Sequence, residues 1–168
     1  MKKVLLLLLV FVLFQKSFSQ NFKVQAIMTY NFTNYLTWSE SDEMKFTIGV
    51  YGEGEFLNEM KIISKNFKVK NKEIEVLEFN KVEDIQNCRI LYVQENKNDE
   101  LENIMGAIEL YSTVLITDNA KDIQTGNDIN FIIEEGKQKF EIYPSNIQKK
   151  SIQIDQQLID MGIVKKDK

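Results

Sequence analysis

Three acidic residues of this chain stand where carboxylate chemistry could be carried out. Glu53 and Glu55 lie in and just after a Gly52-Glu53-Gly54 turn, and Asp118 follows the apolar run TVLIT. Carboxylates of this kind can act as general acid and base or bind a divalent cation. Acids at strand ends more often cap helices or lie in solvated loops. The pattern therefore favours a structural role over catalysis.

The composition excludes most other catalytic chemistry. The chain has no histidine, which rules out Ser-His and Cys-His nucleophile pairs, imidazole acid-base catalysis and ordinary zinc sites. Cys88 is the only cysteine, so it stays unpaired within the chain. Its place before the apolar run ILYV favours a small half-buried residue over a redox role. We therefore predict a protein that is not an enzyme and that has no cofactor and no metal site.

The N-terminal segment predicts export. Two lysines precede an unbroken apolar run from Val4 to Phe14, and small residues end at Ser19. This is the pattern of a cleavable signal peptide, residues 1–19, and the run is too short to span a membrane as an anchor. We expect residues 20–168 to form a single domain in the periplasm. The formal net charge is −4, and nucleic acid is excluded as a partner because it requires a basic face.

Hydrophobic periodicity predicts alternating helices and strands. Helical spacing covers 22–38, 55–65, 99–111, 145–150 and 155–164, and strand patterns cover 46–51, 73–79, 89–93 and 113–117. The pattern of 73–79 is typical of an edge strand, whereas 89–93 and 113–117 are continuously apolar and favour burial on both faces. Residues 129–134 and 138–143 predict an antiparallel hairpin at one edge. The expected fold is a three-layer α/β sandwich, with helices on both faces of a mostly parallel sheet of four or five strands.

A ligand of such a sheet is expected at the carboxyl ends of its strands. The residues at that edge would be Gly52, Glu53, Gly54, Gln94, Thr117 and Asp118. A phosphate-binding loop would need more glycine and a following lysine, and the two acids of this turn would repel phosphate. A periplasmic small-molecule-binding protein is therefore one alternative, with an unspecified ligand.

The order of several sequence blocks resembles the YfiR family, the HmsC-like periplasmic proteins. The blocks are YNFTNYLTW, KFTIGVYGEGEF, NCRILYV, TVLITD, GNDINFI, FEIYPSNIQ and SIQIDQQLI, and they extend from Val24 to Ile163. The resemblance implies a compact α/β sandwich without catalytic activity. It also implies a periplasmic regulator that inhibits a membrane-bound diguanylate cyclase and so limits cyclic-di-GMP signalling and biofilm formation.

Three functions are thus distinguished. The first is a regulatory protein that binds the periplasmic domain of an inner-membrane signalling protein, a diguanylate cyclase or a sensor kinase. The second is the small-molecule-binding protein described above. The third is an enzyme that uses carboxylates such as Glu53, Glu55 and Asp118, with or without a divalent cation. It is disfavoured because acids at strand ends are more often helix caps or solvated loop residues. A homodimer is left open by the sequence.

Overall fold

The computed structural model describes residues 21–39, 43–121 and 126–166. The expected signal peptide, residues 1–19, lies outside them. The N-terminal helix comprises residues 21–32. The remaining elements are β1 (Leu36–Thr37), β2 (Lys45–Tyr51), α2 (Glu55–Asn66), β3 (Lys68–Val69), β4 (Lys72–Phe79), η1 (Val82–Asp84), β5 (Ile90–Val93), η2 (Glu95–Glu100), α3 (Leu101–Ile108), β6 (Val114–Asp118), β7 (Ile129–Glu134), β8 (Lys137–Ile142), α4 (Pro144–Lys149), β9 (Gln153–Ile154), α5 (Gln156–Met161) and β10 (Ile163–Val164).

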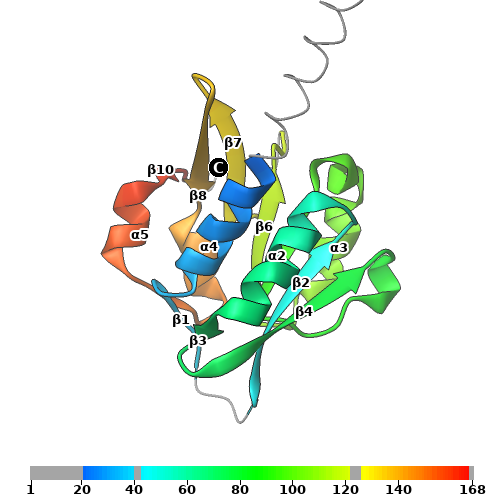
Figure 1. Ribbon diagram of the computed structural model, residues 1–168. Helices are drawn as coiled ribbons and strands as arrows, with labels where there is room; N and C mark the ends of the chain where they lie inside the picture. The colour runs from blue at the N-terminus through cyan, green and yellow to red at the C-terminus, as the bar shows by residue number, and fades with distance from the viewer. Residues whose placement is uncertain (1–20, 40–42, 122–125, 167–168) are drawn as a thin grey trace, which may run out of the picture.

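The main sheet has eight strands in the order β10-β8-β7-β6-β5-β2-β4-β3 (Figure 1). The strands from β4 through β2, β5 and β6 to β7 are parallel, and β7 and β8 form the predicted antiparallel hairpin. Strands β1 and β9 form a separate antiparallel pair. The fold is the α/β sandwich that the sequence predicts, with a larger sheet than the four or five strands expected.

The central strands are apolar throughout because their two faces pack into two different cores. Ile90 and Tyr92 of β5 face the core covered by the N-terminal helix, α2, α4 and α5. Leu91 and Val93 face the core covered by η1 and α3. Side chains alternate between faces along a strand, so a strand with helices on both sides has no solvent-facing positions.

The ends of two helices and the position of one strand in the sheet differ from the prediction. The first helix ends at residue 32, and Leu36 instead belongs to β1, where it pairs with Ile154 of β9 and is fully buried. The predicted last helix ends at Met161, and Ile163–Val164 form β10, a parallel partner of β8. Strand β4 is not the outermost strand, although β3 covers it only at Lys72 and Glu73.

Candidate functional site

The parallel register brings the predicted carboxyl-end residues to one edge of the sheet. Tyr51 pairs with Val93, and Val93 pairs with Thr117. Gly52 follows Tyr51 and Gln94 follows Val93, so Gly52 and Gln94 lie next to each other at this edge. Whether a ligand binds at this edge stays a prediction, and the contacts below describe what the protein itself places there.

The side chain of Gln94 holds the glycine turn. Its Nε2 donates to the carbonyl oxygen of Glu53 at 2.5 Å, and its Oε1 accepts from the backbone N–H of Glu53 at 3.1 Å. Gly52 has φ 119°, and a Cβ atom there would lie 2.2 Å from Gln94 Oε1. Glycine is thus required at this position both for its backbone conformation and for the space that the glutamine occupies. Glu53 and Gly54 themselves are exposed.

The carboxylate of Asp118 is engaged inside the protein. Gln25 Nε2 of the N-terminal helix donates to Asp118 Oδ1 at 2.8 Å, and the Tyr92 hydroxyl lies 3.2 Å from Oδ2. The ring of Tyr92 stacks on Phe56 of α2, with the ring centroids 3.5 Å apart. Burial raises the pKa of Asp118, while the hydrogen bonds from Gln25 and Tyr92 oppose that rise. This geometry joins the first helix to the end of β6.

Thr117 belongs to a different cluster from its neighbour Asp118, because successive side chains of β6 point to opposite faces. The Thr117 hydroxyl donates to Asn130 Oδ1 at 2.8 Å and accepts from Asn127 Nδ2 at 2.8 Å. The structure therefore collects Gly52, Glu53, Gly54 and Gln94 into one contact group and places the Thr117 and Asp118 side chains in two others.

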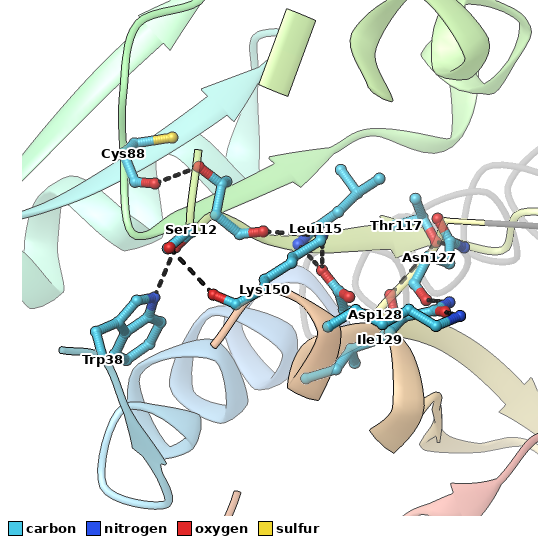
Figure 2. A network of polar contacts seen from close by, with 12 residues as sticks. Trp38, Cys88, Ser112, Leu115, Thr117, Asn127, Asp128, Ile129 and Lys150 are labelled. Atoms are coloured by element: carbon cyan, nitrogen blue, oxygen red, sulfur yellow. Dashed lines mark hydrogen bonds and ion pairs between the residues drawn. The ribbon is translucent and has the colours of Figure 1, made fainter. Parts of the chain in front are cut away.

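Sequence reasoning missed a buried ion pair near the start of β7 (Figure 2). Asp128 is fully buried, and its Oδ2 accepts from Lys150 Nζ at 2.5 Å and from the backbone N–H of Leu115 at 2.6 Å. Lys150 also donates to the carbonyl oxygen of Thr113 at 3.0 Å. Burial raises the pKa of Asp128, and the Lys150 ammonium opposes the rise. In the sequence Asp128 stands two residues after Gly126, so its pattern is that of a turn residue, and no local signal indicates that Lys150 is its partner.

The ion pair is linked to the segment after β1 through Ser112. Trp38 Nε1 donates to the Ser112 carbonyl oxygen at 2.8 Å, and the Ser112 hydroxyl donates to the Lys150 carbonyl oxygen at 3.1 Å (Figure 2). The Thr113 hydroxyl donates to the carbonyl oxygen of Cys88 at 2.6 Å. These contacts tie the segments that precede β5, β6 and β7 to the end of α4.

Cys88 carries a free thiol that is 2 % exposed. Burial raises the pKa of this thiol to about 12, so the thiolate that redox chemistry and metal binding require is suppressed at neutral pH. Within the described ranges, no three histidine, cysteine or acidic side chains are arranged to hold a metal ion. No helix in the part of the chain that the structure describes is long and apolar enough to cross a membrane.

Comparison with known proteins identifies the chain at the level of its family. No curated protein matches the sequence. A family model described as YfiR/HmsC-like matches residues 22–162, which include every strand of the main sheet except β10. The chain therefore belongs to the YfiR/HmsC-like family.

Proposed function

We propose that this protein is an exported, non-enzymatic regulator that binds the periplasmic domain of an inner-membrane signalling protein. The observation that carries the proposal is the family match over residues 22–162. Membership of the YfiR/HmsC-like family supports a periplasmic regulator of cyclic-di-GMP signalling. The partner in this proposal is a diguanylate cyclase or a sensor kinase, and the regulated process is biofilm formation. Residues 20–168 act as one domain after the signal peptide, residues 1–19, has been removed.

The proposed mechanism is a shift in the partner's conformational equilibrium. A regulator inhibits when it binds the inactive conformation of its partner more tightly than the active one, and coupling energies of this kind are about 1–3 kcal/mol. Such a mechanism needs a stable surface and no reacting group. The engaged state of Asp118 supports it over carboxylate catalysis, because Gln25 and Tyr92 already occupy that carboxylate.

Site-specific photocrosslinking in the periplasm tests the regulatory proposal. A photoreactive amino acid would replace one exposed apolar residue at a time on four different segments: Ile27, Ile62, Leu110 or Ile133. We expect one inner-membrane protein with a cyclase or kinase output domain to be captured from some of these positions and not from others. Capture of no membrane protein from any position, or equal capture of the same proteins from all four, would contradict the proposal. Crosslinks to a second copy of the chain would report the homodimer.

The carboxyl-end turn supports a second candidate function, small-molecule binding. The backbone N–H and carbonyl groups of Glu53 are both held by the single amide of Gln94, so a ligand with an adjacent donor and acceptor could take the place of that amide. The candidate site is Gly52, Glu53, Gly54, Gln94, Thr117 and Asp118. Native mass spectrometry of the protein purified after export tests it. A co-purifying small molecule that is lost in Glu53→Pro, which removes the backbone donor, would support this site, and retention in that variant would place the ligand elsewhere.

A further inference from the structure

A pocket of about 510 Å³ opens at the amino ends of β2 and β5, at the opposite end of the sheet from the glycine turn. It lies between the segment after the N-terminal helix, the start of β2, the β3–β4 turn and Arg89. Its volume falls in the range of about 300–1,000 Å³ that small-molecule sites occupy. Nothing in the proposed regulatory function requires a cavity at this position.

One wall of the pocket is aromatic and fixed in place. Trp38 and Phe46 both line it, and their rings meet edge to face with centroids 5.3 Å apart. The hydrogen bond from Trp38 Nε1 to the Ser112 carbonyl oxygen holds the indole in this orientation. Trp38 is partly exposed and Phe46 is buried, so the wall offers an apolar surface with little rotational freedom to lose on binding.

Four of the other residues that line the pocket are cationic. Lys45, Lys70, Lys72 and Arg89 line the pocket, and Glu43 is the one acidic side chain among those lining residues that the structure describes. The whole chain has a formal net charge of −4, so this pocket differs in sign from the protein as a whole. A concave site lined by one sign of charge attracts ligands of the opposite sign.

The cations differ in how far carboxylates of the chain already balance them. Arg89 pairs with Glu43 at 2.8 Å, and its side chain is only 13 % exposed. Lys45 pairs with Glu75 at 2.6 Å. Lys70, by contrast, is exposed and donates to the neutral hydroxyl of Thr37 at 3.3 Å.

The turn that carries Lys70 has an unusual backbone. Lys70 and Asn71 have φ 47° and 69°, and they connect the paired residues Val69 and Lys72 of β3 and β4. Asparagine tolerates the left-handed region, but a lysine there costs about 1–2 kcal/mol. Lys70 in this two-residue turn and Lys72 at the start of β4 both line the pocket.

We propose that this pocket binds a small organic anion, a carboxylate or a phosphate ester, whose apolar or aromatic body packs against Trp38 and Phe46. The anionic group meets Lys70, while Lys72, Lys45 and Arg89 supply further positive charge in the pocket lining. The ligand class follows from this combination, since the aromatic wall selects for an apolar body and the lysines select for negative charge.

Trp38 makes the test direct, because it is the only tryptophan of the chain and lines the pocket. Phenyl phosphate serves as the probe, with inorganic phosphate as the comparison that lacks the ring. We expect phenyl phosphate to change Trp38 fluorescence in a saturable way and isothermal titration calorimetry to give the same affinity. Inorganic phosphate is expected to bind more weakly, and the affinity for phenyl phosphate is expected to fall when NaCl is raised from about 20 to about 300 mM.

Charge-removing variants locate the binding. Lys70→Gln is expected to weaken phenyl phosphate binding by about tenfold, the loss of one charge-assisted hydrogen bond, and Lys72→Gln is expected to weaken it less, through the loss of a nearby positive charge. Lys65→Gln removes an exposed lysine of α2 outside the pocket lining and is expected to bind as the unaltered protein does. The proposal is overturned if neither phenyl phosphate nor benzoate binds up to about 10 mM, or if the pocket variants match Lys65→Gln. Since no partner protein is present in these titrations, their failure would leave the crosslinking result unaffected.

Discussion

Replacing Lys150 by methionine tests whether the buried ion pair stabilises the junction of β6, β7 and α4. The change keeps a long apolar side chain but removes the ammonium group that lies 2.5 Å from Asp128 Oδ2. Asp128 is fully buried, and none of the residues that the structure describes donates a hydrogen bond to its Oδ1. Among the described residues, the backbone N–H of Leu115 is then the one remaining hydrogen-bond donor to this carboxylate in the variant.

The cost of protonating Asp128 sets an upper bound on the loss of stability in this variant. If Asp128 cannot remain charged, the variant folds with a neutral Asp128, and protonating a carboxyl of unfolded pKa about 3.9 at pH 7 costs about 4 kcal/mol. Removing one partner of a buried pair generally costs about 3–5 kcal/mol. The Lys150 side chain is 22 % exposed, so water offsets part of this cost. We expect a loss of about 2–4 kcal/mol in the free energy of unfolding at pH 7.

The pH dependence of the stability loss shows whether the uncompensated charge of Asp128 causes it. A carboxyl whose folded pKa lies above its unfolded pKa binds more protons in the folded state, so stability falls as pH rises between the two values. Burial already places Asp128 in this class, and loss of Lys150 raises its folded pKa further. The difference between the variant and the unaltered protein should therefore grow by up to about 1.4 kcal/mol per pH unit once the pH exceeds the folded pKa of Asp128 in the unaltered protein. Near pH 4 it should shrink to about 1 kcal/mol, the cost of the lost hydrogen bond to Thr113.

Urea unfolding followed by Trp38 fluorescence and by circular dichroism measures these free energies. Lys149→Met, a change at the exposed preceding residue, is the matched control and is expected to cost less than about 0.5 kcal/mol. Asp128→Asn combined with Lys150→Met removes the buried charge and should abolish the steep pH dependence. A loss at pH 7 below about 1 kcal/mol, or an equal loss at pH 4 and pH 7, would refute the role assigned to this pair.

Two further substitutions test close contacts, and one labelling experiment tests the burial of Cys88. Gly52→Ala should lower the free energy of unfolding by about 2 kcal/mol or more, because residue 52 has a positive φ and the new Cβ clashes with Gln94. Adding Gln94→Ala should recover only the part of this loss that is due to the clash, and full recovery would contradict the backbone argument. Gly162→Ala would place a Cβ 2.6 Å from the ring of Phe140 and should cost about 1–3 kcal/mol, which Phe140→Leu should reduce; an unchanged unfolding midpoint would contradict the close approach. The thiol of Cys88, with its pKa raised to about 12, should react with iodoacetamide at neutral pH only after unfolding in guanidinium chloride, and rapid labelling of the folded protein would contradict its burial.

The sequence predicts the central strands well because their chemistry is unambiguous. Leu91 and Tyr92 lie within the run ILYV, which has no polar position. Only a strand covered on both faces buries such a run completely, and the two cores on either side of β5 do so. Local composition is sufficient here because the burial of each residue does not depend on which particular helix covers it.

Short strands were not predictable in the same way. Leu36 continues the apolar periodicity of the first helix, yet its burial comes from pairing with β9, more than a hundred residues later in the chain. Val164 likewise extends the periodicity of α5 but pairs with Ile142 of β8. Two-residue strands have no pattern of their own, and Gly162 before β10 was the available sign that the last helix ends there.

The candidate site shows the same division between local and long-range information. The parallel arrangement predicted that Gly52 and Gln94 would meet, because consecutive parallel strands end at one edge. The partners of Asp118 and Asp128 were not predictable. Gln25 precedes Asp118 by 93 positions, and Lys150 lies beyond the whole β7–β8 hairpin. A buried carboxylate requires a partner, but its position in the sequence does not say which residue provides it.

The two ends of the sheet differ in charge. Because of this difference, we expect an anion to bind at the amino ends of the strands and not at the carboxyl ends, where open α/β sheets usually bind anions. Open α/β sheets bind anions at their carboxyl ends because helix N-termini with free backbone N–H groups point there. In this protein α2 begins with Glu55 directly after Glu53 and Gly54, so acidic side chains already occupy the favourable end of the helix dipole. The amino ends instead gather Lys70 and Lys72 around an aromatic wall. An anion should therefore prefer the end of the sheet where side chains, and not helix termini, provide the positive charge.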